Sequence, residues 1–219
     1  MNRHATRALL VIFLSPTVAG GQPQDADAKG PAVELILANF AGAPQDVFDS
    51  ATRQARTIFA LAGVNLDVVT CFAHERANDT RCAQQPGANQ VHIRLLRRPR
   101  DRKIEFDPHT GGVAIRGTEA RNSGFVTIYY DRVEEIAQGL EISRGTVLGH
   151  VMAHEVGHLL LPEGSHSQDG IMQERLWPED WRNASMGRLL FTSQQKQLMQ
   201  LALRASERIT AQRIAGKTP

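Results

Sequence analysis

The apolar stretch of residues 143–161 constrains this chain more than any other feature, because it has a helical pattern and carries three of the chain's histidines. It contains the run His154-Glu155-Val156-Gly157-His158. Residues four apart lie on one face of a helix, so the imidazoles of His154 and His158 can reach a single metal ion. Glu155 lies about 100 degrees around the helix from His154, near that face but not on it. The stretch therefore predicts a helix that offers two metal ligands beside a free carboxylate.

Zinc is the metal that this pattern favours, because it accepts neutral imidazoles in a tetrahedral site. Glu155 is then predicted to act as the general base, which takes a proton from a zinc-activated water and later delivers it to the leaving amine. The alternative is a core helix whose histidines are incidental. His150 precedes His154 by four residues but has no Glu after it, so we expect it to support a ligand or simply to pack.

The run HEVGHLLLPEGSHSQDGIM resembles the zincin metalloproteases, and within them the metzincins. The metzincin pattern is HExxHxxGxxH followed by a tight turn with Met beneath the metal. Gly170-Ile171-Met172 is the candidate Met-turn, and the interval from His158 to Met172 matches that of matrixin-type members. The resemblance implies a zinc peptidase in which Met172 packs below the metal and does not bind it.

A second resemblance is to an uncharacterised family of secreted bacterial proteins with no assigned substrate. It shares the segments AHExGHLLL, SHS and GIM and a following Trp. In this chain they are Ala153–Leu161, Ser165–Ser167, Gly170–Met172 and Trp177.

The third metal ligand departs from the metzincin pattern, which places a Gly where this chain has Leu161 and a His where it has Gly164. His166 follows two residues later. Pro162 disfavours helical geometry at Leu161 and Gly164 permits a sharp turn, so a reshaped loop can bring His166 to the metal. We expect His166 to complete the site. The alternatives are carboxylates, either local or, as in gluzincin-like sites, on a later helix: Glu163, Asp169, Glu174 and Glu179.

The hydrophobic pattern predicts strands and helices that open in the order β-α-β, and their order resembles the first half of the metzincins. The resemblance implies an α+β fold with a zincin-like mixed β-sheet. Strands are expected at 33–40, 65–71, 90–96, 112–115 and 124–130. Helices are expected at 44–62, 132–138, 143–161 and from Thr192, with a loop to about Ser185 before the last one. Thr192-x-x-Gln195 reads as a capping box. The last helix is expected to pack through Leu198, Leu201, Ala205 and Ile209.

Two smaller features complete the expected fold. Tyr129 and Tyr130 end the last strand, where they either stabilise an oxyanion or pack. The charged, Pro-containing segment 97–112 is expected to be a solvated loop.

The first residues predict how the chain is organised. Residues 1–20 have a basic start, a short apolar run and a small-residue end, the pattern of a signal peptide cleaved after Ala19 or Gly20. Residues 21–31 read as a flexible linker and 32–219 as one zincin-like domain. No later segment reaches the roughly 20 apolar residues that a membrane span needs. We therefore expect a secreted or periplasmic protein.

Cys71 and Cys82 fit an oxidising compartment, because they enclose a polar stretch that cannot hold itself by burial. A disulfide would stabilise it by about 2–3 kcal/mol. The alternatives are free thiols or metal ligands, and no further Cys or His pair at metal-finger spacing supports the latter.

Charge balance narrows the partners. The chain has 25 Lys and Arg against 23 Asp and Glu, and removal of Arg3 and Arg7 with the leader leaves them equal. No excess charge remains to neutralise phosphates, which disfavours nucleic acid. We expect a secreted, monomeric zinc peptidase acting on peptides or proteins. The alternatives are an extracellular binding protein with a structural zinc or lost turnover, and a hydrolase of non-peptide amides.

Overall fold

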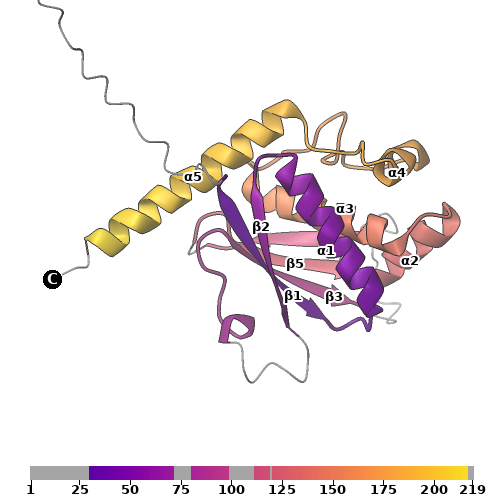
Figure 1. The fold of residues 1–219 in the computed structure, drawn as a ribbon, viewed down its shortest axis with the longest axis horizontal. Helices are drawn as coiled ribbons and strands as arrows, with labels where there is room; N and C mark the ends of the chain where they lie inside the picture. The colour runs from indigo at the N-terminus through magenta and orange to yellow at the C-terminus, as the bar shows by residue number, and fades with distance from the viewer. Residues whose placement is uncertain (1–29, 72–79, 99–110, 119, 217–219) are drawn as a thin grey trace, which may run out of the picture.

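One five-stranded sheet organises the protein (Figure 1). The computed structural model describes residues 30–71, 80–98, 111–118 and 120–216. The strands are β1 (Ala32–Asn39), β2 (Asn65–Cys71), β3 (Gln90–Leu96), β4 (Gly112–Arg116) and β5 (Gly124–Tyr129). Their order is β2-β1-β3-β5-β4, with β4 antiparallel to β5 and all other pairs parallel. The predicted α+β class and mixed sheet are confirmed.

In the described part of the chain, five α-helices and one short 3-10 helix accompany the sheet. They are α1 (Gln45–Ala60), α2 (Tyr130–Gly139), α3 (Arg144–Leu160), α4 (Pro178–Ser185), α5 (Ser193–Ala215) and the 3-10 helix Thr80–Cys82. Helices α1 and α3 cover the same face of the sheet (Figure 1). Alternate strand residues face them and form the core: Leu35, Leu37, Ile93, Leu95, Val126 and Ile128.

Glycines bring α1 and α3 into close contact. A Cβ added to Gly149 would lie 2.6 Å from the Cβ of Gln54 and 2.9 Å from the carbonyl oxygen of Ala51. One turn earlier, a Cβ on Gly145 would lie 2.5 Å from that of Ser50. Any side chain at these two positions would push the helices apart. The two glycines therefore set how deeply α3 is buried.

Cys71 and Cys82 form the predicted disulfide, with their Cα atoms 5.9 Å apart. The bond joins the end of β2 to the 3-10 helix. Disulfides of this kind persist in oxidising compartments, so this one fits an extracellular protein. None of the helices among the described residues has the length and apolar content to cross a membrane.

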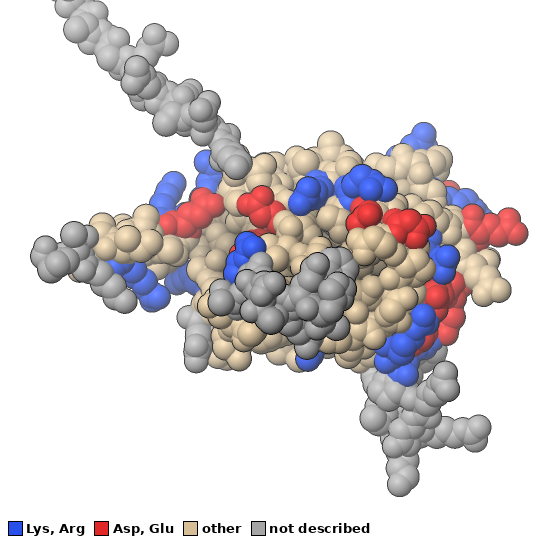
Figure 2. Space-filling model, turned by 60° about the horizontal axis from the view of Figure 1, so that its bottom comes forward, with Lys and Arg blue, Asp and Glu red and all other residues tan. Residues whose placement is uncertain are grey.

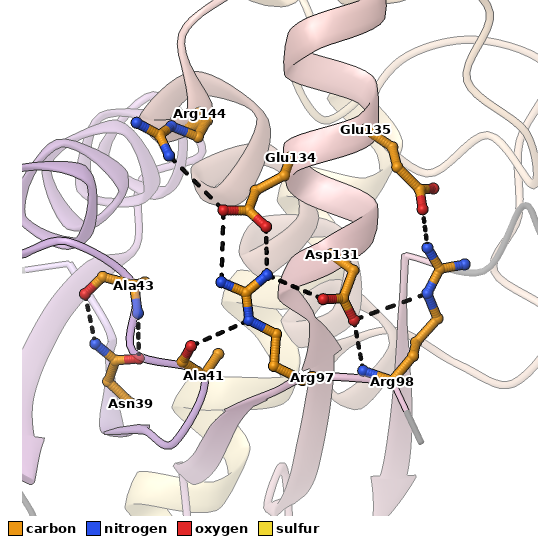
Figure 3. A network of polar contacts seen from close by, with 9 residues as sticks. All are labelled: Asn39, Ala41, Ala43, Arg97, Arg98, Asp131, Glu134, Glu135 and Arg144. Carbon is orange, nitrogen blue, oxygen red and sulfur yellow. Dashed lines mark hydrogen bonds and ion pairs between the residues drawn. The ribbon is translucent and has the colours of Figure 1, made fainter. Parts of the chain in front are cut away.

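Ion pairs attach the start of α2 to the ends of β1 and β3 (Figure 3). Arg97 donates to the carbonyl of Ala41 at 3.2 Å, to Asp131 at 3.0 Å and to Glu134. Glu134 also pairs with Arg144, the first residue of α3, at 3.7 Å. Beside them, Arg98 pairs with Glu135 and donates its backbone N–H to Asp131.

This network bears on the prediction of a solvated loop over residues 97–112. Residues 97 and 98 are indeed outside any helix or strand and Arg97 is exposed, but both side chains also pair with acidic residues of α2. At the other end Gly112 already belongs to β4, and residues 99–110 lie outside the described residues. Elsewhere on the face that Figure 2 draws, basic and acidic side chains of the described residues are interspersed, without a patch of one sign.

Helix α4 lies where a loop to about Ser185 was predicted, so that prediction is wrong. Pro178 occupies its first position, where the missing N–H has no cost. The carboxylate of Asp180 accepts the backbone N–H of Trp177 at 2.8 Å and caps the helix start. Trp181 is buried and supplies the packing that an eight-residue helix needs. The sequence signal for this helix was its capping residues, and a search for apolar periodicity does not detect them.

Helix α5 begins at the predicted capping box, but only part of its predicted face packs. The Thr192 hydroxyl accepts the N–H of Gln195 at 3.3 Å, and the Gln195 side chain accepts the N–H of Thr192 at 2.9 Å. Leu198 packs against the core as predicted, beside the buried Met199 and Leu203, whereas the predicted Leu201 and Ala205 are exposed, Leu201 to 66%. The helix contacts the body of the protein as far as Ser206, which is buried, and Glu207, which accepts the N–H of Ala32 at 3.1 Å; its last turns project from the body (Figure 1). The inward face is therefore set by that contact.

The other predicted strands and helices match the structure within two residues at each end. The leader 1–20 and linker residues 21–29 lie outside the described residues, so cleavage and the domain boundary remain predictions.

The contact between α1 and α3 yields a test. Gly149→Ala should lower the free energy of unfolding by about 1–3 kcal/mol, because the new methyl meets the backbone of α1. The control is Gly139→Ala in α2, where an added Cβ has nothing within 4 Å. It should leave stability unchanged or raise it, since Ala is the better helix former. Urea unfolding of both variants measures the difference; equal stabilities would contradict the packing.

Candidate metal centre

Three histidines converge beside α3. Ligand atoms of His154, His158 and His166 lie within 4.8 Å of one another. The Nε2 atoms of His154 and His158 are 3.0 Å apart, and the ring centroid of His166 lies 5.7 Å and 4.8 Å from those of His154 and His158. The group could hold a metal ion. The structure therefore brings together all three residues that the sequence predicted as ligands.

A backbone carbonyl sets the orientation of His154. Its Nδ1 lies 2.7 Å from the carbonyl oxygen of Ile171. A carbonyl can only accept, so Nδ1 carries the proton and Nε2 keeps its lone pair toward the other histidines. Outer contacts of this kind are usual for metal-binding histidines. Ile171 belongs to the predicted Met-turn, so that segment holds His154 in position through its backbone.

Burial keeps the imidazoles of α3 neutral. It lowers the pKa of His154, and it lowers the pKa of His158 to about 4, with smaller effects from the neighbouring histidines and from Arg116. A metal binds the unprotonated ring nitrogen. The two histidines of the helix are therefore in the protonation state that ligation requires at neutral pH.

The segment after α3 folds back so that His166 returns to the helix. Ser167, the next residue, donates its N–H to the Met172 carbonyl at 3.0 Å, and its hydroxyl accepts from Gln195 of α5 at 3.0 Å. Gly164 and Gly170 adopt positive φ values of 70° and 77°, which favour glycine. These turns and contacts hold the segment so that His166 reaches the helix, although it lies two residues later in the sequence than the third His of the metzincin pattern.

The carboxylates left open as alternative ligands do not join this group among the described residues. Glu163 and Glu174 line the neighbouring cavity, and Glu179 pairs with Arg182 on α4. The backbone carbonyl of Asp169 accepts the Ser167 hydroxyl at 2.7 Å. Among the candidates, His166 is the third residue placed with His154 and His158.

Glu155 is only 7% exposed although it is an acid. Burial raises its pKa to about 8. Strand β4 passes directly over it: a Cβ on Gly112 would lie 2.9 Å from the Glu155 Cγ and 3.0 Å from its Oε1. The carboxyl group therefore lies between α3 and the backbone of β4, next to the histidines.

Arg116 connects the other end of β4 to the end of α3. Its guanidinium donates to the carbonyl oxygens of Leu159 at 2.6 Å and Leu161 at 2.8 Å, and also to that of His158. Both ends of this five-residue strand thus touch the site, Gly112 at Glu155 and Arg116 at His158.

Met172 lies fully buried against the helix between the two histidine turns. A Cβ on Gly157 would lie 2.5 Å from the Met172 sulfur and 3.1 Å from the ring of Phe191. Gly157 is thus the position that admits the Met172 side chain. The assignment of Met172 as the residue of a Met-turn stays a prediction.

A cavity of about 840 Å³ opens beside the histidines. One wall is the start of β4, residues 111–114, and the floor includes Glu155 and Val151 of α3. Ile136, Leu176 and Trp181 add apolar surface. The volume is within the range of ligand sites.

Three further candidates are not among the described residues that line this cavity. Tyr130 is fully buried with Arg97 5.0 Å from its ring, and neither it nor Tyr129 is among the described residues that line the cavity. His150 is also fully buried, with Nδ1 donating to the Thr146 carbonyl at 2.8 Å. The sequence analysis missed Gly112 and Arg116. No local pattern marks Arg116, whereas the Gly111-Gly112 pair was a signal of close backbone approach.

Comparisons with known proteins give only distant similarities. No family model and no curated protein matches the chain. Metalloproteinase-II from Bacteroides fragilis is similar at TM-score 0.47 and 12% identity, covering 82% of this chain and 55% of that one. Archaemetzincin from Methanopyrus kandleri is similar at TM-score 0.45 and 15% identity, covering 79% of this chain and 96% of that one. This chain thus spans about half the length of the first protein, and similarities at this level establish no family.

The packing of Met172 can be tested with two variants. Met172→Leu should cost less than about 1.5 kcal/mol of stability and retain metal binding, because the volume is similar and the sulfur is not needed as a ligand. Gly157→Ala should cost more, about 1–3 kcal/mol, because the methyl collides with that sulfur. Unfolding curves and metal content measure both. Loss of metal in a folded Met172→Leu variant would show that the sulfur is a ligand.

The burial of Glu155 predicts a pH-dependent cost in the metal-free protein. Its pKa rises from 4.5 to about 8 on folding, so the folded state keeps a proton that the unfolded chain releases between these values. Stability relative to Glu155→Gln therefore falls as pH rises through that window. Near pH 8 the variant should be more stable by on the order of a few kcal/mol, and near pH 4.5 the two should be similar. Urea unfolding with a chelator tests this, with exposed Glu163→Gln as the matched control. A stability difference between Glu155→Gln and the wild type that does not change with pH would contradict the prediction.

Proposed function

We propose that this chain is a secreted zinc-dependent peptidase. The observation that carries the proposal is the convergence of three imidazoles at the wall of a cavity. The buried carboxyl group of Glu155 lies beside them and is not part of the group that could hold the metal. The disulfide between Cys71 and Cys82 and the leader-like pattern of residues 1–20 support secretion.

Zinc fits the donor set. Structural zinc sites have four protein ligands, whereas catalytic sites have three and keep one position open. The described residues supply three histidines and no fourth Cys, His, Asp or Glu in the group. His154, His158 and His166 would hold the ion. When bound, zinc lowers the pKa of water and polarises a carbonyl as a Lewis acid.

Glu155 is the group placed to move the proton. It follows a predicted ligand directly, yet its carboxyl lies under β4 and is not part of the histidine group. A carboxyl whose pKa is raised toward neutrality can both accept and return a proton in that pH range. In peptide hydrolysis Glu155 would take the proton of the attacking water and deliver it to the leaving amine. A binding protein with a closed structural zinc would have no use for this arrangement.

The edge strand supports a peptide substrate. Strand β4 is the last strand in the order of the sheet, so no other described strand pairs with its outer side. The same strand forms a wall of the cavity beside Glu155. An extended peptide can add to such an edge through main-chain hydrogen bonds. This placement favours a peptide or protein over a small amide.

Substitution of the four site residues separates binding from turnover. His154→Ala, His158→Ala and His166→Ala should each weaken zinc binding, because each removes one of three ligands. Glu155→Gln should retain zinc and lower peptide hydrolysis by about 100-fold or more, because it removes only the base. Zinc content by mass spectrometry and cleavage of a mixed peptide library measure the two properties.

The matched controls are Glu163→Ala and Glu174→Ala, which line the same cavity outside the histidine group. Both should keep zinc. Full activity in Glu155→Gln would refute the mechanism, and zinc binding by the wild type without cleavage of any peptide would favour the binding-protein alternative.

A further inference from the structure

We propose that Arg116 is a positioning residue that holds the end of α3 in the shape that lets His158 and His166 converge. The inference rests on the proposed metal site. Arg116 lies in the edge strand β4 and is not one of the proposed metal ligands. Its role would be an addition to the site that the spacing of the histidines does not predict.

The end of α3 leaves backbone carbonyls that its own helix cannot satisfy. The last carbonyls of any helix lack intrahelical donors. Here the chain becomes extended at Leu161, with φ −98° and ψ 161°, and the next residue, Pro162, has no N–H. The Leu161 N–H reaches back to the Gly157 carbonyl at 2.9 Å. The carbonyls of the following residues are left for a donor from elsewhere.

Arg116 supplies that donor. Its Nη1 donates to Leu159 at 2.6 Å, and its Nη2 donates to Leu161 at 2.8 Å and to His158. In the described part of the chain Arg116 pairs with no carboxylate, so its charge is directed at these oxygens. A cation is favourable at a helix C-terminus, and the planar guanidinium can reach several acceptors at once.

The three carbonyls belong to the part of the chain that bears the ligands. One is the carbonyl of His158 itself. Leu161 is the residue at which the chain leaves the helix, five positions before His166. One guanidinium thus holds the last helical turn and the first residue of the exit together. Without it, the direction in which the chain leaves α3, and hence the place of His166, would rest on the more distant contacts of Ser167.

The site depends on this contact because its ligand spacing is unusual. Leu161 and Pro162 end the helix before the position where a third His would follow in the metzincin pattern, and His166 lies two residues later. A longer segment between the end of the helix and the third histidine has more conformations that must be restricted. Arg116 restricts this segment at its first residue, Leu161.

The test compares arginine variants on two faces of the sheet. Arg116→Ala and Arg116→Lys are made beside the control Arg94→Ala; Arg94 lies in β3 and donates to Thr127 at 3.2 Å. Zinc affinity is measured by competition with a chelator, and the ligand geometry by the visible absorption of the cobalt-substituted protein. Stability of the metal-free variants is measured in parallel.

We expect Arg116→Ala to weaken zinc binding by about 10- to 100-fold, as loss of outer contacts at metal sites does, and to change the cobalt spectrum. Arg116→Lys, which keeps the charge and a donor, should fall between it and the wild type. Added methylguanidinium should restore part of the affinity in Arg116→Ala. Arg94→Ala should behave as the wild type in every measurement.

Affinity within twofold of the wild type and an unchanged cobalt spectrum in Arg116→Ala would overturn the proposal. Should Arg116→Ala not fold, Arg116→Lys decides in the same way, by an altered or an unaltered spectrum. A wild-type protein that binds neither zinc nor cobalt would refute the metal site itself, whereas wild-type binding with unaffected variants would refute only the role of Arg116.

Discussion

The burial of α3 is the constraint on which the rest of the structure depends. Buried residues occur on all sides of this helix, which packs against α1 through glycines and against the sheet through aliphatic side chains. A helix that is apolar all round belongs in a core. The three histidines and the glutamate on this helix cannot simply be solvated. Their polar groups need partners that the fold brings to them, and the candidate site consists of those partners.

The partners come mainly from the backbone. The Ile171 carbonyl orients His154, the backbone of Gly112 covers the carboxyl of Glu155, and the carbonyl of His158 faces Arg116. Backbone groups within a packed core move little, so they hold a ligand more firmly than exposed side chains do. This explains how His166, exposed and on a loop, can still meet two buried histidines: its neighbour Ser167 is tied to Met172 and to α5.

Strand β4 connects the proposed chemistry with the proposed substrate. It is antiparallel to β5 and forms the edge of the sheet, it touches Glu155 at one end and the end of α3 at the other, and it forms a wall of the cavity. A peptide that pairs with this strand would therefore lie along the histidine group. The ion pairs around Arg97 and Asp131 act at a different place, where they fasten α2 to the strand ends ahead of α3. Exposed ion pairs contribute little stability each, so their effect is to orient these helices.

The sequence by itself determined the strands, the central helices, the disulfide and the pair His154 and His158, because period, capping residues and spacing are local properties. Thr192 and Gln195 predicted where α5 begins, and the interval from His154 to His158 predicted two ligands. Only the tertiary structure decided the face through which α5 packs, the existence of α4, and the choice of His166 over four carboxylates. It also brought Gly112 and Arg116 to the site from a strand about forty residues away. These depend on which surfaces meet after the chain has folded back, and contacts between distant segments leave no period in the sequence.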